Sequence, residues 1–246
     1  MNIFNKYKIC HLTHTHSEYK DIWPIYFGQM NKFWDLNIKH FFLNNSSEEI
    51  IPENYDFIVY EDKLPYTERL IKTFSELNDF DFVIFDHEDM FLYSQPDFNE
   101  IASYMEYMIS DEFDHIRLIR GGDCIFEKVN GSKSLFKIDS KSKWIFSVQP
   151  GFWKISKLID LLKLNRNLNI WDLERYSQKK IKRLKLNCAF SHENGKKRGI
   201  HHFDNQVYPY IASAIIKGKW NLSEYPLELG NILDQYKIDP LLRGTC

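Results

Sequence analysis

The chain has 246 residues, of which 43% are hydrophobic, 16% aromatic and 27% charged, and its formal net charge is −2 at pH 7. This composition excludes a disordered chain. The length lies near the upper end of what one hydrophobic core supports, so we expect a single domain over residues 1–246. The balanced charge excludes general attraction to nucleic acid, because such binding relies on clustered Lys and Arg.

Cysteine spacing and hydropathy exclude two further classes of protein. Cys10, Cys124, Cys188 and Cys246 form no C-x-x-C pair, so the sequence predicts reduced thiols rather than a zinc knuckle or a disulfide framework. No signal peptide is expected, and no window reaches the roughly 18 apolar residues of a spanning helix. We therefore expect a soluble, cytoplasmic protein without a transmembrane segment. The basic run 178–185 is typical of a solvated helix face, and peripheral contact with an anionic membrane or acceptor is the alternative.

The hydrophobic pattern, taken in chain order, alternates between strands and helices. Short apolar runs between polar residues predict strands, and apolar residues at steps of three and four predict helices. The expected strands cover residues 8–13, 38–43, 55–60, 82–85, 115–120 and 144–148. The expected helices cover residues 21–37, 66–79 and 98–112, with another beginning near 154. This alternation predicts an α/β fold with a mostly parallel central sheet.

Three carboxylates follow the most apolar strand, 82–85, which is typical of the buried centre of such a sheet. Ligands bind beyond the carboxyl ends of these strands, where Asp86, Glu88 and Asp89 would lie. Asp86 and Glu88 share a face if the strand continues, and Asp89 would reach in from the turn. Carboxylates hold Mg²⁺ or Mn²⁺ together with ligand phosphates, so the pattern predicts a metal and diphosphate site. The alternative is acids that cap a helix starting near Met90 or solvate a turn.

Two adjacent histidines, His201 and His202, stand late in the chain. They would supply a metal ligand or a phosphate contact, or they are ordinary surface histidines. The basic residues 196–198 just upstream would meet a diphosphate. The loop that contains them has the composition of a flexible lid.

An acidic pair, Asp172 and Glu174, lies beside Trp171. A carboxylate next to an aromatic side chain is a candidate general base for a sugar hydroxyl. The alternative is a helix N-terminus with acids in its first turn. The loop after the first strand lacks a G-x-G-x-x-G pattern, so dinucleotide binding is not expected.

Several of these segments resemble the GT-A nucleotide-sugar glycosyltransferases, in particular the small capsule- and surface-glycan enzymes of bacteria and large viruses. The matching pieces, in the family's order, are LTHTHSEYKDIWPIYF, ERLIKTFSELNDFDFVIFDHEDMFL, HIRLIR, SVQPGFWKISKLIDLL and NIWDLE. They extend from about residue 10 to 175, and the remainder matches loosely. The family's acidic motif is usually Asp-x-Asp, whereas this chain has Asp-His-Glu-Asp.

The resemblance implies a Rossmann-like sheet with a nucleotide-binding part over about 1–120 and an acceptor-side part over about 121–246. It implies a general base at Asp172 or Glu174. The implied donor-binding residues are Thr13, His14, Thr15, Tyr19, Arg69 and Asp86. The implied metal ligands, for Mn²⁺ or Mg²⁺, are Asp86, Glu88, Asp89, His201 and His202. The implied acceptor-binding residues are Gln149, Trp153 and Trp171.

The function that these expectations describe is transfer of a sugar, with inversion, from a nucleotide-diphosphate donor to a hydroxyl of a glycan, free or linked to lipid or protein. A metal-dependent phosphoesterase would also use acids at strand ends. The chain has no second carboxylate and histidine cluster before residue 80 to hold two metals. A non-catalytic nucleotide- or glycan-binding module of the same fold is the other alternative, which donor turnover would exclude.

Overall fold

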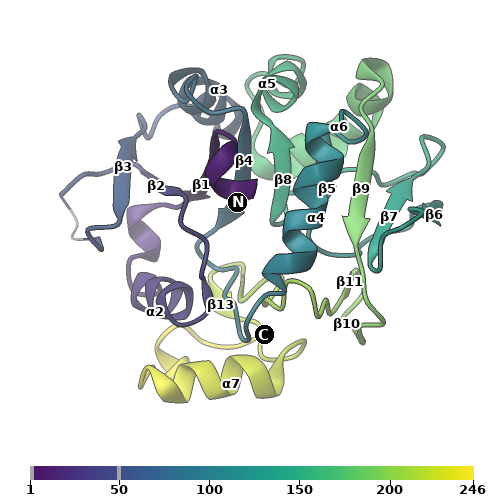
Figure 1. The fold of residues 1–246 in the computed structure, drawn as a ribbon. Helices are drawn as coiled ribbons and strands as arrows, with labels where there is room; N and C mark the ends of the chain where they lie inside the picture. Colours follow the sequence, from purple (N-terminus) through teal and green to yellow (C-terminus); the bar gives the residue numbers. More distant parts are fainter. Residues whose placement is uncertain (1–2, 49–50) are drawn as a thin grey trace.

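The computed structural model describes residues 3–48 and 51–246. Its central sheet consists of β1 (Ile9–His14), β2 (Lys39–Asn44), β3 (Tyr55–Val59), β4 (Phe82–His87), β5 (His115–Arg117), β6 (Phe126–Lys128), β7 (Leu135–Ile138), β8 (Gly151–Lys154) and β9 (Cys188–Ser191). The strand order is β3-β2-β1-β4-β8-β5-β9-β7-β6 (Figure 1). Only β7 and β8 of these strands run against the others. The predicted α/β fold with a mostly parallel sheet is confirmed.

Helices cover both faces of this sheet. They are α1 (Ile3–Lys6), α2 (Trp23–Phe33), α3 (Tyr66–Glu76), α4 (Phe98–Ile109), α5 (Ile155–Lys163), α6 (Ile170–Leu184) and α7 (Pro226–Gln235). One hydrophobic cluster joins the sheet to α2, α4 and α7, and a second joins it to α3, α5 and α6. Small hairpins complete the chain, β10 (Lys197–Arg198) with β11 (His202–Phe203) and β12 (Ile215–Ile216) with β13 (Lys219–Trp220). The result is three layers, with two cores separated by the sheet.

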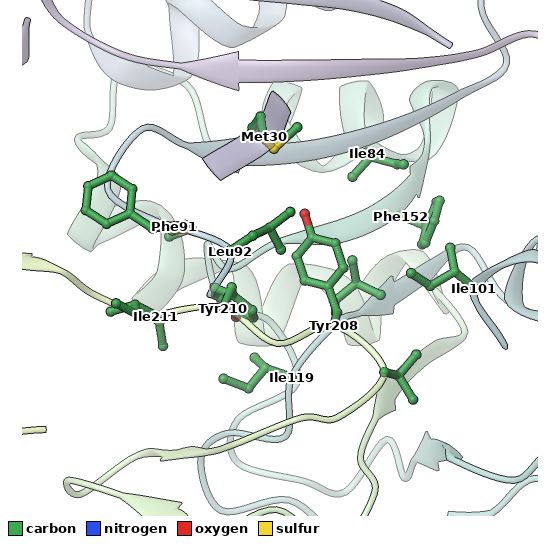
Figure 2. Packing of buried hydrophobic residues seen from close by; sticks show 14 of the residues in the cluster. Met30, Ile84, Phe91, Leu92, Ile101, Ile119, Phe152, Tyr208, Tyr210 and Ile211 are labelled. Atoms are coloured by element: carbon green, nitrogen blue, oxygen red, sulfur yellow. The ribbon is translucent and has the colours of Figure 1, made fainter. Parts of the chain in front are cut away.

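Alternation along β4 decides which side chains face which core. Ile84 packs into the first cluster, whereas Val83 and Phe85 pack into the second. Figure 2 shows Ile84 in the same cluster as Met30 of α2 and Tyr208 of a late segment. By the same alternation, Asp86 faces the α2 side and His87 the α3 side.

The strand expected at 144–148 is wrong. The backbone N–H groups of Ile145 and Phe146 donate to the side-chain oxygen of Gln178 in α6, at 2.6 and 3.1 Å. The Gln178 amide nitrogen donates in turn to the Phe146 carbonyl oxygen at 2.7 Å. These side-chain bonds take the place of a strand ladder, and the ladder resumes at Gly151, after Pro150, which has no N–H to donate.

Changing Gln178 to Leu is expected to lower the free energy of unfolding by about 3 kcal/mol, because three buried backbone groups lose their partner at roughly 1 kcal/mol or more each. Urea denaturation measures this change. Gln235→Leu at the exposed end of α7 is the matched control, with an expected change within about 0.5 kcal/mol. Equal effects of the two changes would contradict the bracing role of Gln178.

All four cysteines, Cys10, Cys124, Cys188 and Cys246, are free thiols. Burial raises the pKa of the Cys10 and Cys188 thiols to about 12, so both stay protonated at neutral pH. Within residues 3–48 and 51–246, no helix is both long and apolar enough to cross a membrane.

Candidate functional site

The carboxyl ends of β1 and β4 meet at one edge of the sheet. His14 and His87 are register partners there, and the chain turns away from the sheet after each of them. Tyr19 follows β1 in a short 3-10 turn, and Glu88 and Asp89, here called the acidic pair, follow β4. This edge is therefore the place where the sequence predicts ligand binding.

Asp86 points away from that edge into the core. Its side chain is 2% exposed, and its Oδ2 atom lies 3.0 Å from Nε2 of His11 and accepts from the Tyr26 hydroxyl at 3.3 Å. The Thr13 hydroxyl is bonded to the same Tyr26 hydroxyl. The expected shared face of Asp86 and Glu88 is wrong, because β4 ends at His87. Asp86 and Thr13, expected at the donor, belong instead to a buried polar network.

Removing this carboxylate tests its structural role. Asp86→Ala is expected to lower the free energy of unfolding by about 3 kcal/mol, because His11 and Tyr26 each lose a buried hydrogen-bond partner. Urea denaturation again provides the measurement. Asp79→Ala, which removes an exposed acid, should change stability by less than about 0.5 kcal/mol. A loss for Asp86→Ala as small as that would contradict the network.

Burial raises the pKa of both carboxyl groups of the acidic pair. Burial, and then the Asp89 carboxylate, raises the pKa of Glu88 well above its usual value. Burial raises the pKa of Asp89 to about 6, and the backbone N–H of Ile215, 3.3 Å from Oδ2, opposes the shift. Both acids carry charge more readily when a positive group is near.

The chemistry of this pair fits Mg²⁺ or Mn²⁺, which bind one or two carboxylates together with substrate phosphates. The wider predicted ligand set is not assembled: in the part of the chain described here, no group of three or more His, Cys, Asp or Glu side chains is placed to hold a metal ion. His202 pairs instead with Gly121 through the backbone, and its Nδ1 atom lies 3.9 Å from Oε2 of Glu224. His201 is exposed, with its carbonyl oxygen accepting from the Gly122 N–H. The metal remains a prediction that concerns the acidic pair.

Arg243 is a site residue that sequence reasoning missed. Its guanidinium lies 5.2 Å from the ring centre of Tyr19 and is ion-paired with Asp21 at 2.5 Å. Its positive charge opposes the upward pKa shifts of both Glu88 and Asp89. No pattern in the sequence marks this arginine, because only the fold brings the C-terminal segment back to β1 and β4.

Aromatic rings and imidazoles line the α3 side of the edge. His14 stacks on Tyr60 with 5.4 Å between ring centres, and the Arg69 guanidinium lies 4.3 Å from the same Tyr60 ring. His87 Nε2 lies 2.8 Å from the Tyr66 hydroxyl. Burial lowers the pKa of His87 to about 4 and that of His14 well below its usual value, so both are neutral. His14, Tyr60, Tyr66, His87 and Arg69 pack together in what is here called the aromatic cluster, which brings together two predicted donor residues, His14 and Arg69.

Thr15 is buried beside the aromatic cluster, with both of its oxygen atoms engaged. Its hydroxyl accepts from the Trp23 indole N–H at 2.8 Å, and its carbonyl oxygen accepts from the Tyr60 hydroxyl at 2.8 Å. Buried Nε2 of His14 and Nδ1 of His87 have no hydrogen-bond partner among the residues described. The aromatic cluster therefore contains two buried nitrogen atoms that are open to a hydrogen bond.

Asp172 and Glu174 occupy different surroundings at the start of α6. Asp172 lies in the first turn, where its carboxylate accepts from the Asn169 amide at 2.9 Å, as the helix-cap alternative predicts. Glu174 is largely buried and accepts from the backbone N–H of Val148 at 2.5 Å. Burial raises the pKa of Glu174, and the hydrogen bond from Val148 and the charge of Arg117 oppose that shift. A carboxylate with a raised pKa is the better general base near neutral pH.

Arg117 is fully buried and braces the loop beside Glu174. It donates from Nε to the Ile119 carbonyl at 3.0 Å, from Nη1 to the Ser147 hydroxyl at 3.0 Å and from Nη2 to the Gly121 carbonyl at 2.9 Å. Because Ser147 precedes the residue that Glu174 binds, Arg117 and Glu174 hold the same segment. Sequence reasoning missed Arg117, although a charged residue within a short apolar strand is an available signal.

The residues expected at the acceptor differ sharply in exposure. Trp153 is 2% exposed and stacks on His115 with 3.9 Å between ring centres, so it is a core residue, although it lines a small pocket together with Gln149. Gln149 has both ends of its amide engaged, by the Ala212 carbonyl and the Tyr210 hydroxyl. Trp171 is 70% exposed, which leaves it free to contact a ligand.

Part of the basic segment 196–198 is a strand, where a flexible lid is expected. Lys197 and Arg198 form β10 of the β10–β11 hairpin, and Arg198 is ion-paired with Asp204 at 2.9 Å and also with Glu228. The predicted diphosphate contact is therefore not available at Arg198, whose charge two carboxylates compensate, whereas Arg243 is paired with the single, exposed Asp21.

Comparison with known proteins finds a likeness in fold and none in sequence. No family model matches the chain, and no curated protein matches it. Among solved structures it is similar to S. aureus TarS 1-349 in complex with UDP-GlcNAc, with a TM-score of 0.50 and 10% identity, over 80% of this chain and 58% of that one. The chain thus spans less than two thirds of the length of that protein fragment. The likeness shows the fold alone: the chain has an α/β, GT-A architecture.

Proposed function

We propose that the chain transfers a sugar from a nucleotide-diphosphate donor to a hydroxyl of a glycan acceptor, with inversion at the anomeric carbon. The observation that carries this proposal is the position of the acidic pair, which directly follows the carboxyl end of β4 and is close enough to Arg243 for the arginine's charge to act on both acids. In α/β sheets this edge is where nucleotides bind. The fold shared with a UDP-GlcNAc complex supports the same class of donor.

In this proposal the nucleotide lies against the aromatic cluster, next to Arg69, and the diphosphate lies between the acidic pair and Arg243. A divalent cation bound by Glu88 and Asp89 together with the diphosphate would neutralise charge that develops on the leaving group. Arg243, on the other side of the diphosphate from the acidic pair, contributes positive charge that does not depend on a metal.

Glu174 acts as the general base. It removes the proton of the acceptor hydroxyl, whose oxygen forms a bond to the anomeric carbon as the bond from that carbon to the diphosphate oxygen breaks. The proton is then held by Glu174, and the leaving group departs as a nucleoside diphosphate. Attack opposite the leaving group inverts the anomeric carbon. Arg117 holds the Ser147–Val148 segment that positions the Glu174 carboxylate.

A panel of UDP-, GDP-, dTDP- and CMP-sugars, each with and without Mn²⁺, tests donor binding. A ligand that binds only the folded state raises the thermal midpoint, by an amount set by its concentration relative to Kd. We expect a rise with one of the diphosphate donors, the UDP-, GDP- or dTDP-sugars, that grows when Mn²⁺ is added, and no rise with CMP-sugars, which carry a single phosphate. No rise with any member of the panel would contradict the proposed donor site.

A further inference from the structure

A cavity that the acidic pair does not line opens at the β6 edge of the sheet. It has a volume of about 530 Å³ and lies between the β6–β7 hairpin and the C-terminal end of α6. Figure 1 shows β6 and β7 at the right-hand end of the sheet, whereas β1 and β4 lie to the left of its middle. The donor and base of the proposed reaction do not use this cavity.

The two walls of the cavity carry different chemistry. Lys182 and Lys185 of the α6 wall are exposed, and neither has an ion-pair partner within the described residues. The hairpin wall carries the carboxylates of Glu127 and Asp139, and Lys137 is the register partner of Glu127. One wall therefore attracts anionic groups, and the other offers acceptors for hydroxyl donors.

The exposed face of α6 connects this cavity to the acceptor side of the site. Its exposed side chains are Trp171, Arg175, Tyr176, Lys179, Lys182 and Arg183. The buried face of the same helix carries Leu173 and Ile181, so the cations lie along one side. From Glu174 to Lys182 the helix rises about 12 Å. A stripe of cations and aromatic rings thus runs from the general base to the cavity.

We propose that this stripe and cavity bind an anionic glycan chain, the part of the acceptor that lies beyond its reacting hydroxyl. Negatively charged groups on the chain pair with the α6 lysines, and its hydroxyls donate to Glu127 and Asp139. A flat membrane surface does not enter a concave cavity with a carboxylate wall, so the observations favour a chain over a lipid bilayer. The claim that the bound chain is the acceptor rests on the proposed function. The claim that an anionic chain binds rests on the cavity and the stripe themselves.

Binding of fluorescently labelled chains to the full-length protein tests this site. The probes are an oligoalginate, which carries a carboxylate on every sugar, and a neutral maltooligosaccharide of equal length. We expect the oligoalginate to bind at least about tenfold more tightly, with an advantage that shrinks at high salt. The double change Lys182→Gln with Lys185→Gln should weaken oligoalginate binding about fivefold to tenfold.

The matched control is Lys32→Gln with Lys72→Gln, which removes two exposed lysines from α2 and α3 and should leave binding unchanged. Equal binding of the two chains, no binding of either, or equal affinity of wild type and the α6 variant would overturn the site. So would lysine-dependent binding of phosphatidylglycerol vesicles without binding of oligoalginate, which would indicate a membrane surface.

The same samples, titrated with nucleotide sugars, separate this inference from the proposed function. Donor binding without chain binding would overturn the cavity site alone. Chain binding without donor binding would overturn the acceptor role and the proposed transfer, and leave a glycan-binding cavity.

Discussion

Changing Glu88 to Gln and Asp89 to Asn together is expected to lower the rate of sugar transfer by on the order of 100-fold or more. The loss follows because a cation held by these carboxylates contributes several kcal/mol to the stabilisation of the leaving group. The Mn²⁺-dependent part of the donor-induced thermal shift should disappear in the same variant. Initial rates and thermal midpoints, each with and without Mn²⁺, measure both effects.

The same variant is expected to be more stable than wild type at neutral pH. Folding raises the pKa of both acids, so the folded state holds their protons more tightly than the unfolded state does. For Asp89 the resulting loss of stability develops as pH rises from its usual 3.8 to about 6. The amides carry no charge and avoid this loss.

Glu76→Gln with Asp79→Asn, two exposed acids, is the matched control and should leave rate and thermal midpoint unchanged. If transfer stayed at the wild-type rate in the Glu88 and Asp89 variant, the acidic pair would have no part in the reaction. A lower thermal midpoint for that variant at neutral pH would show that the pair stabilises the fold instead.

Changing Glu174 to Gln is expected to lower kcat by roughly 100- to 10,000-fold, the range that a general base contributes. The amide keeps an oxygen atom that accepts from the Val148 N–H, so the fold and donor binding should persist. Asp172→Asn changes a helix-cap residue and should alter kcat by no more than a few fold. Steady-state kinetics with a saturating donor measure the difference.

The pH profile identifies the group that titrates. Because burial raises the pKa of Glu174, the wild-type rate should rise with pH through that raised value as the carboxylate ionises. The Gln variant should lack this rise. If Asp172→Asn lowered kcat more than Glu174→Gln does, Asp172 would be the general base instead of Glu174. If neither change mattered, an inverting mechanism with either base would be untenable and a retaining course would have to be considered.

Much of the fold could be predicted from the sequence because its strands and helices have regular hydrophobic patterns. The strand at 144–148 was expected for the same reason, since its apolar pattern is that of a strand. The pattern does not reveal that Gln178, far along the chain, supplies the hydrogen bonds that a neighbouring strand would otherwise provide. Side-chain competition for backbone groups is a tertiary effect.

The site was less predictable because orientation decides the role of each residue. Asp86 and Glu88 are both carboxylates and lie two positions apart. Because β4 ends at His87, Asp86 is buried against Tyr26, whereas Glu88 lies just beyond the strand at the sheet edge. Trp153 and Trp171 are likewise the same residue type, yet Trp153 in β8 is buried and Trp171 at the start of α6 is exposed. Arg243 was missed because its proximity to the acidic pair depends on the path of the whole C-terminal segment.

Identification of the nucleotide released from a bound nucleotide sugar tests the central claim most directly. With donor, Mn²⁺ and a hydroxyl acceptor, the account predicts a nucleoside diphosphate and a glycosylated product, both greatly reduced in the Glu88 and Asp89 variant. Release of a nucleoside monophosphate with a sugar phosphate would show that a phosphoester is hydrolysed instead. Binding of the donor without any product would show a module that keeps the fold without the chemistry.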